Sequence, residues 1–194
     1  SDPVARMLRA KASFHIIPNM NPDGSRHGNL RTNHAGANLN REWDKATVQS
    51  SPEVYYTLEA MDAAKPDMCL DVHGDEALPY NFIAGAEGIP GYTHKQADNL
   101  ETFLDAYETA SPDFQTEIGK NHAKYFDAEG WLFFTKERFD LLYPSYGDTY
   151  PMFNGSIGMT YEQAGHGRAG KGIDLENGDT LRLIDRIEHH TTNA

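Results

Sequence analysis

The stretch MCLDVHG, Met68–Gly74, decides the fold prediction. A short apolar run over 68–72 is typical of a buried strand, and the polar His73-Gly74 pair marks its end. A second stretch, SIGMTYE at 156–162, alternates between apolar and polar residues and predicts another strand. Successive side chains of a strand point to opposite faces, so one of its faces carries Ile157, Met159 and Tyr161 and the other carries Thr160 and Glu162.

Helical and extended patterns alternate on both sides of these two stretches. Ser51-Pro52-Glu53 combines a capping hydroxyl, a proline at the first helical position and an acid in the first turn. We expect helices at 4–11, 52–64, 92–109 and from Asp179 onward, and further strands at 13–18 and 81–84. The region 131–150 is rich in aromatic residues and fits no single element. The alternation predicts an α/β fold.

Length and charge limit the classes of function. The chain has 194 residues, which is the size of one domain, and we assign 1–194 to a single domain. Its formal net charge of −12 disfavours nucleic acid and anionic membranes as partners. Its apolar runs are far shorter than the roughly 20 residues that span a bilayer. A single cysteine, Cys69, fits a reducing compartment, so we expect a cytoplasmic protein.

Polar residues that can carry chemistry fall in the long loop 19–41 and at the ends of the two strands. Arg31 and the Asn40-Arg41 pair lie in the loop, and two arginines with an asparagine can hold an anion by forked hydrogen bonds. His73 and Glu162 end the strands, where ligands bind in open α/β sheets. Taken singly, each residue also fits a structural role, with His73 hydrogen-bonded and Arg31, Arg41 and Glu162 facing water.

The order of five motifs carries more information than any one residue. They are PNMNPDG at 18–24, GNLR at 28–31, GANLNREW at 36–43, DVHG at 71–74 and TYEQA at 160–164. In this order they resemble the zinc carboxypeptidase family, and within it the branch of the cytosolic carboxypeptidases and their bacterial relatives. The resemblance implies a mixed, mostly parallel sheet with helices on both faces.

The resemblance also implies a role for each matched residue. His73 corresponds to the third zinc ligand, and Arg31 to the arginine that stabilises the oxyanion. Asn40 and Arg41 correspond to the pair that holds the terminal carboxylate of the substrate, and Glu162 to the general base. A tyrosine that closes over the substrate is either Tyr146 or Tyr150. The implied activity is zinc-dependent removal of the C-terminal residue of a peptide or protein, with a zinc-activated water as nucleophile.

Two departures from the family pattern are visible. Asn38 stands where the family commonly has an aspartate that orients the first zinc-binding histidine. The His-x-x-Glu motif that supplies the first two zinc ligands is absent before Ser13, so we expect 1–194 to be an N-terminally truncated catalytic domain that binds zinc weakly and is inactive alone. The one His-x-x-Glu spacing in the chain, His73–Glu76, is an alternative ligand pair. Its position favours the third-ligand role for His73.

Two other functions remain open at this point. A non-catalytic relative would use Asn40 and Arg41 to bind carboxylate-bearing peptides without hydrolysing them. An amidohydrolase would act on acyl amino acids. The retained Glu162 favours an enzyme over a binding protein, and the Asn-Pro-Asp-Gly loop favours the carboxypeptidase branch. No pattern in the sequence indicates the substrate side-chain preference or the oligomeric state.

Overall fold

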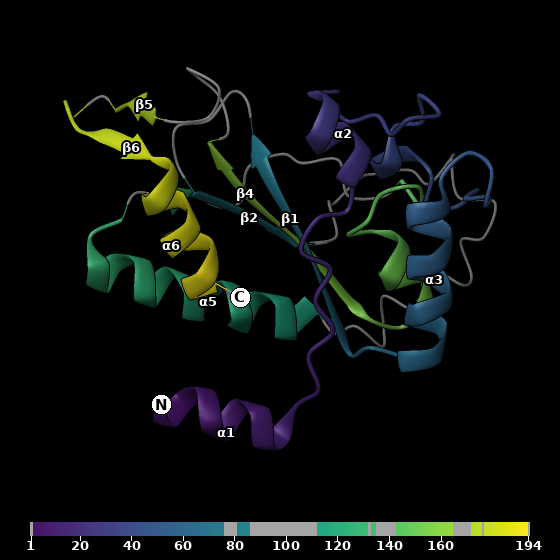
Figure 1. Cartoon of the computed structure of the whole chain (residues 1–194). Coiled ribbons are helices and arrows are strands. Elements are labelled where there is room, and N and C mark those ends of the chain that lie inside the picture. The colour runs from purple at the N-terminus through teal and green to yellow at the C-terminus, as the bar shows by residue number, and fades with distance from the viewer. Residues whose placement is uncertain are drawn as a thin grey trace, which may run out of the picture.

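The structure is a computed structural model that describes residues 2–75, 81–85, 112–131, 133–134, 143–164, 172–175 and 177–193. Its helices are α1 (Pro3–Lys11), α2 (Pro22–His27), η1 (Leu39–Arg41), α3 (Pro52–Ala64), α5 (Pro112–Glu129), η2 (Tyr150–Asn154) and α6 (Leu183–Asn193). Its strands are β1 (Met68–Asp75), β2 (Asn81–Gly85), β3 (Phe133–Phe134), β4 (Ile157–Ala164), β5 (Gly172–Asp174) and β6 (Thr180–Arg182). Four helical segments precede the first strand, and helices and strands are interspersed after it, which confirms the predicted α/β class (Figure 1).

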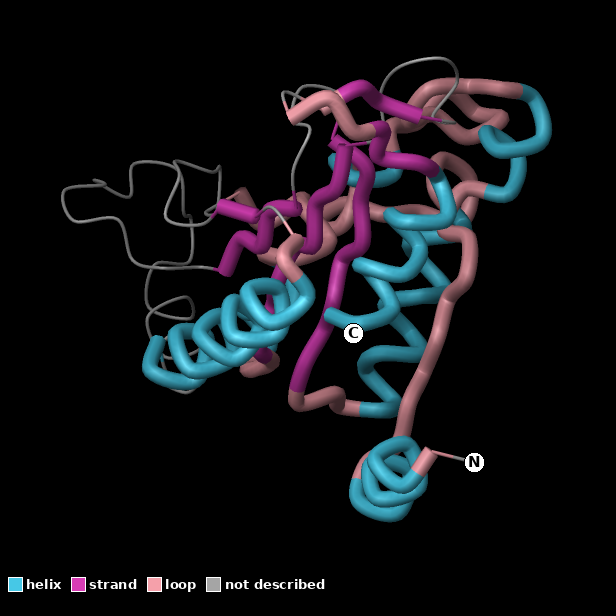
Figure 2. The backbone as a smooth tube through the Cα atoms, turned by 90° about the vertical axis from the view of Figure 1, so that its left-hand side faces the viewer, coloured by secondary structure: helices cyan, strands magenta, loops and turns pink. Residues whose placement is uncertain are grey.

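The central sheet is mixed, with the strand order β1-β4-β2-β3. β1 pairs with β4 and β2 pairs with β3 in parallel, whereas β2 and β4 are antiparallel. β5 and β6 form a separate antiparallel pair. The parallel β1–β4 register places Met68 beside Ile157 and continues to His73 beside Glu162. The prediction of a mixed, mostly parallel sheet is confirmed (Figure 2).

Helices cover both faces of this sheet. Alternate residues of β4 point to opposite faces, and each face contacts different elements. Tyr161 packs edge-on against His122 of α5, with ring centroids 5.3 Å apart. Thr160, one residue earlier, is hydrogen-bonded to Asp148 in the segment that leads into η2. α5 and α3 accordingly lie on opposite sides of the sheet in Figures 1 and 2. Among the described residues, the buried apolar core includes Val54, Phe126, Met152, Met159 and Tyr161.

Three predictions differ from the structure. Residues 68–72 were predicted as a buried strand, but β1 ends the strand order of the described sheet, and Met68 and Val72 are 40% and 51% exposed. Residues 13–18 were predicted as a buried strand, but they form neither helix nor strand, and Phe14, Ile16 and Ile17 are 54–80% exposed. An apolar run becomes a strand only where a neighbour takes its backbone hydrogen bonds, and none of the described strands pairs with it. The last helix starts at Leu183 rather than at Asp179, because Thr180–Arg182 pairs with β5. The predicted helix 92–109 lies outside the described residues.

The loop 19–41 is more structured than its polar composition indicates. The side chain of Asn21 accepts a hydrogen bond from the Gly24 amide, and it thereby caps the short helix α2. An isolated bridge between Thr32 and Asn38 then closes a small turn, after which η1 begins. α3 begins at Pro52 as predicted, although the Ser51 hydroxyl makes no capping bond and donates to Glu42 at 3.5 Å. The loop therefore presents Arg31 and Asn40 from a folded segment.

Candidate functional site

His73 and Glu162 lie side by side, two residues before the carboxyl ends of β1 and β4. They are register partners in a parallel pair, so their side chains share one face of the sheet. Burial acts to lower the pKa of His73. The hydrogen bond and charge of Asp71, with the charges of Glu162 and Asp148, outweigh it and raise the pKa of His73 above its ordinary value. The surroundings of His73 near the carboxyl ends of these strands therefore favour its positively charged form.

The His73 ring is held from the side by Asp71, two residues earlier on the same strand. The distance from His73 Nε2 to Asp71 Oδ2 is 2.8 Å, and Asn40 Nδ2 lies 3.3 Å from the same ring nitrogen. One ring nitrogen cannot donate to the carboxylate and accept from the amide at once. The shorter contact and the opposite charge favour the proton on Nε2, donated to Asp71. His73 Nδ1 then carries the lone pair.

The segment 145–149 crosses this polar face of the sheet and connects it with η1. The Gly147 amide donates to Asn40 Oδ1 at 2.7 Å, and the Trp43 amide donates to the Ser145 carbonyl at 3.3 Å. A Cβ at position 147 would lie 2.6 Å from Asp71 Oδ2, so only glycine allows this approach. The amide of Asn40 is thereby oriented by a segment more than a hundred residues later in the chain.

Arg41 and Tyr146 contact each other beside Asn40. The Arg41 guanidinium lies 4.2 Å from the centroid of the Tyr146 ring, a cation–π arrangement. Arg41 Nη1 also donates to the Asn40 carbonyl at 2.6 Å. Tyr150 sits further along, with its ring 6.2 Å from that of Trp43. Of the two predicted tyrosines, Tyr146 is the one in contact with Arg41.

Arg31 stands apart from this group. Its side chain is exposed, and no hydrogen bond or ion pair of that side chain is among the contacts of the described residues. Its backbone adopts φ 63°, a conformation that costs energy for a residue with a side chain. The Arg31 carbonyl accepts from the Leu39 amide at 3.4 Å, which ties its turn to η1. The structure therefore brings together His73, Glu162, Asn40, Arg41 and Tyr146, and places Arg31 on the rim of the turn.

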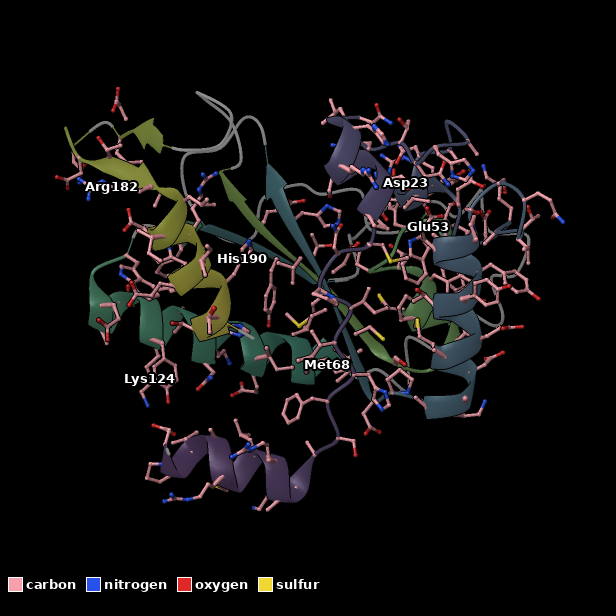
Figure 3. The ribbon with its side chains drawn as sticks, viewed as in Figure 1. Asp23, Glu53, Met68, Lys124, Arg182 and His190 are labelled. Carbon is pink, nitrogen blue, oxygen red and sulfur yellow. The ribbon has the colours of Figure 1, made fainter. Side chains whose placement is uncertain are left out.

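Two groups near His73 were not identified from the sequence. Asp148 is 5% exposed, and burial raises the pKa of its carboxyl, while the hydrogen bond from Thr160 partly opposes that rise. His190, labelled on α6 in Figure 3, donates from Nε2 to the His73 carbonyl at 3.0 Å. The sequence places His190 at a polar helix end and Asp148 in an unassigned segment. No local pattern indicates either contact, because both form only on folding.

The ligand set at His73 bears on the metal that the motifs imply. A histidine held by a carboxylate is the usual arrangement of a zinc ligand, and His73 with Asp71 fits it. Catalytic zinc takes three protein ligands, however, and the described residues gather no group of three ligand atoms around His73. Glu76, from the alternative His-x-x-Glu pair, lies outside the described residues. The described part of the chain therefore provides one candidate metal ligand at this position and does not gather three.

None of the helices in the described part of the chain is long and apolar enough to cross a membrane.

Comparison with known proteins gives consistent matches. The sequence profile of the zinc carboxypeptidase family matches residues 1–78. An uncharacterized protein of Zymomonas mobilis is 51% identical over 119 residues, which cover 61% of this chain and 31% of that protein. Human cytosolic carboxypeptidase 4 is 37% identical over 91 residues, 44% of this chain and 8% of its own.

A solved structure extends the likeness to the fold. The crystal structure of a metallo-carboxypeptidase from Burkholderia cenocepacia has a TM-score of 0.60 with this chain at 36% identity, over 100% of this chain and 48% of that one. The chain thus spans less than half the length of each of these three proteins.

Proposed function

Because the chain belongs to the zinc carboxypeptidase family, we propose that it carries part of the catalytic domain of a metallocarboxypeptidase. The full-length protein then hydrolyses the C-terminal peptide bond of peptides or proteins. The observation that carries this proposal is the convergence of His73, Glu162 and the Asn40-Arg41 pair at one edge of the sheet. The names of the cytosolic carboxypeptidase relatives support placing the full-length protein in the cytoplasm.

In this proposal, Asn40 and Arg41 hold the terminal carboxylate of the substrate. The Gly147 amide occupies Asn40 Oδ1, so the Nδ2 group is the one turned toward the site. The Arg41 guanidinium is half-buried and held by the Asn40 carbonyl, which reduces the entropy lost when it pairs with an anion. Tyr146 covers one side of that guanidinium and is our choice for the tyrosine that contacts the substrate, with Tyr150 as the alternative.

Glu162 acts as the general base, and Arg31 faces the developing negative charge. Glu162 takes a proton from the attacking water and later passes it to the leaving amine nitrogen. Its position beside His73 supports this role, since the two side chains share one face at the same level of the sheet. Arg31 is exposed in the structure, and its turn is tied to η1 next to Asn40. A donor that approaches the scissile carbonyl from this turn would stabilise its oxyanion.

Zinc supplies Lewis-acid activation of water when bound. In this chain, His73 is the residue that would contact it, and the two further ligands come from the remainder of the full-length protein. Asn38 supports that division, because its buried Oδ1 has no hydrogen-bond partner among the described residues. A histidine from outside the described residues can donate to this oxygen.

Substitution of the base tests the proposal against a pure binding function. In the full-length protein, Glu162→Gln should lower kcat by roughly 10²–10⁴ while peptide affinity stays within about threefold. Glu129→Gln, at the exposed end of α5, is the matched control and should change neither quantity. Unchanged turnover in Glu162→Gln would refute the catalytic assignment. Binding without turnover in the unsubstituted protein would identify a non-catalytic relative.

Carboxylate recognition is tested with peptides that differ only at their C-terminus. The unsubstituted full-length protein should bind a free C-terminal carboxylate far better than the corresponding amide. Arg41→Gln should reduce that preference by roughly 10- to 100-fold, since it removes a charged hydrogen-bond donor. Arg26→Gln on α2 is the exposed control. A preference for acylated amino acids over peptides would favour the amidohydrolase instead.

A further inference from the structure

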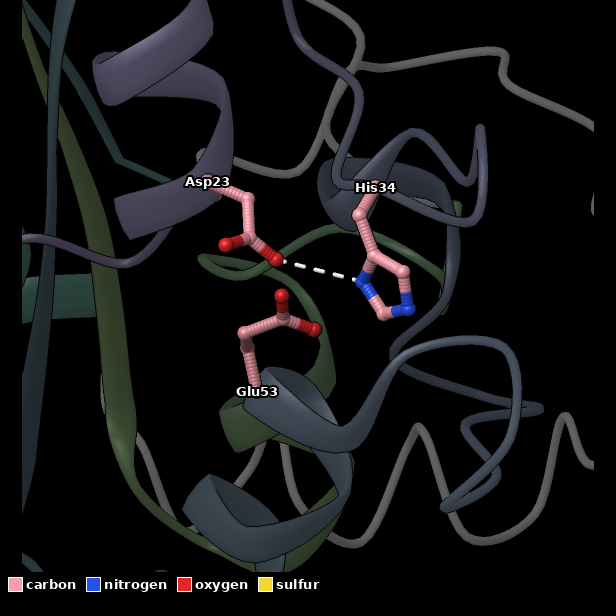
Figure 4. A group of neighbouring side chains, drawn as sticks. All are labelled: Asp23, His34 and Glu53. Carbon is pink, nitrogen blue, oxygen red and sulfur yellow. Dashed lines mark ion pairs between the residues drawn. The ribbon is translucent and has the colours of Figure 1, made fainter.

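Three ligand-type side chains from separate segments meet outside the site described above. Asp23 belongs to α2, His34 to the turn after Arg31, and Glu53 to the first turn of α3 (Figure 4). Their ligand atoms all lie within 4.8 Å of one another, and His34 Nδ1 is 3.1 Å from Asp23 Oδ2. Ligands of a tetrahedral ion at zinc distances are about 3.4 Å apart. The group thus needs only a small contraction to surround one ion.

Two asparagines fix the backbone that presents these side chains. Asn33 is 1% exposed; its Oδ1 accepts from the amides of Ala35 and Ala37, each at 3.0 Å. Its Nδ2 donates to Glu53 Oε2 at 3.2 Å, so the residue before His34 also holds the glutamate. Asn21 joins the start of α2 to the same turn by donating to the Thr32 carbonyl at 3.0 Å. The three segments are therefore braced before any ion binds.

Among the described residues, no ion pair with a lysine or arginine balances the charges of this group. Asp23 and Glu53 bring two carboxylates together, and His34 is the one partner of Asp23 among the ion pairs of the described residues. An ion pair joins Asp23 to His34, and the hydrogen bond from Asn33 holds Glu53 beside them but brings no positive charge to its carboxylate. A divalent cation would neutralise both carboxylates and use the imidazole as well. One nitrogen and two oxygen donors suit Zn²⁺ or Mn²⁺ better than Ca²⁺ or Mg²⁺, which take oxygen ligands.

We propose that Asp23, His34 and Glu53 bind one divalent transition-metal ion, with water completing its coordination. This site shares no residue with the cluster at His73, and it does not depend on the proposed function. An ion there would link α2, the turn 31–38 and α3 at one point. Arg31 lies between two of the ligands in the sequence, so metal binding would also restrict the turn that carries it. The role of the ion is structural.

Calorimetric titration of the full 194-residue chain with Zn²⁺ or Mn²⁺ alone tests the site. We expect one equivalent to bind and to raise the melting temperature, with much weaker binding of Mg²⁺ or Ca²⁺. His34→Gln should weaken Zn²⁺ binding at least tenfold and remove the rise in melting temperature. His27→Gln, on the exposed end of α2, is the matched control and should bind as the unsubstituted chain does. Glu53→Gln retains an acceptor for Asn33 and should also weaken binding.

Two further results separate this site from a zinc site at His73. His73→Ala should leave the titration unchanged, because His73 contributes no ligand to the group. Equal Zn²⁺ affinity in His34→Gln and the unsubstituted chain would overturn the proposal, as would loss of binding in His73→Ala alone. Absence of Zn²⁺ and Mn²⁺ binding to the folded, unsubstituted chain would also overturn it.

Discussion

The two faces of β4 differ in what buries them. On one face, Met159 and Tyr161 are 2% and 1% exposed and pack toward α5. On the other, which also carries Glu162, Gly158 and Thr160 meet a polar segment that contains the buried carboxyl of Asp148. The strand is thus held by apolar packing on one face and carries polar residues of the candidate site on the other. Alternation at every second residue lets one strand do both, because its two faces need not share their neighbours.

The two faces of β4 also differ in the interactions that stabilise them. The α5 face gains stability from apolar area and ring packing, which depends little on the identity of the polar residues opposite. The polar face depends on close approach: a glycine at 158 admits the Asp148 carbonyl, and a glycine at 147 admits the Asp71 carboxylate. Substitutions on the apolar face should therefore destabilise the fold by loss of packing, and substitutions on the polar face by steric overlap.

The largest effect is expected on the apolar face. Phe126 of α5 is 1% exposed, with its ring 5.4 Å from Phe133 and 5.7 Å from Trp131. Phe126→Ala should lower the free energy of unfolding by about 3–5 kcal/mol, because it leaves a cavity among those rings. Urea denaturation measures the change. Tyr125→Ala, at a position 52% exposed, is the control and should cost far less. Equal losses would contradict the assignment of the core to this face.

A smaller loss is expected from the polar face. A Cβ at Gly158 would overlap the carbonyl oxygen of Asp148, which belongs to the backbone and has little room to move. Gly158→Ala should cost about 1–3 kcal/mol and displace the segment 145–149. Gly119→Ala in α5 has open space around its Cβ and should instead stabilise by about 0.5–1 kcal/mol. Thermal denaturation of the two variants compares them; stabilisation by Gly158→Ala would exclude the close approach.

A polar contact within the apolar face should matter less. The Tyr161 hydroxyl and His122 Nε2 are 3.1 Å apart, and burial strongly raises the pKa of that hydroxyl. Tyr161→Phe removes the hydrogen bond but keeps the ring, so we expect a loss of about 1 kcal/mol in chemical denaturation. Tyr56→Phe, on an exposed tyrosine of α3, should leave stability unchanged. A loss in Tyr161→Phe as large as in Phe126→Ala would show that the hydroxyl, rather than the ring, dominates.

The smallest effect is a pH dependence at the edge of the same face. His189 of α6 lies 4.0 Å from the Trp131 ring, and burial lowers its pKa while Asp185 and Glu188 act to raise it. The unfolded chain then binds the proton more readily than the folded chain, so this residue makes stability fall as pH drops below about 6.5.

Melting temperatures measured from pH 7.5 to pH 5 test this sign. His189→Gln should flatten the fall on the acid side relative to the unsubstituted chain, whereas His15→Gln, in the exposed segment before α2, should leave it unchanged. A steeper acid loss in His189→Gln would reverse the assigned direction.

Much of the fold was accessible from sequence because its strongest signals are local. The apolar run before His73, the alternation from Ile157 and the Pro52 helix start each depend on neighbouring residues, and the structure places elements at all three. The segment 13–18 has an equally apolar run but no strand partner among the described residues. In α6, Ile184 and Ile187 are 63% and 52% exposed, whereas Arg186 and His189 are buried. Which side of a helix is covered depends on its neighbours.

The sequence by itself determined the α/β class, the two strands that carry His73 and Glu162, and the ordered motifs that resemble the zinc carboxypeptidases. Only the tertiary structure decided which of those residues touch. It placed Gly147 on Asn40, Tyr146 on Arg41 and His190 against the His73 carbonyl, and it brought Glu53 to Asp23 and His34. The reason is physical: periodicity reports the burial of a residue's own face, whereas these contacts join segments whose separation in the chain leaves no local trace.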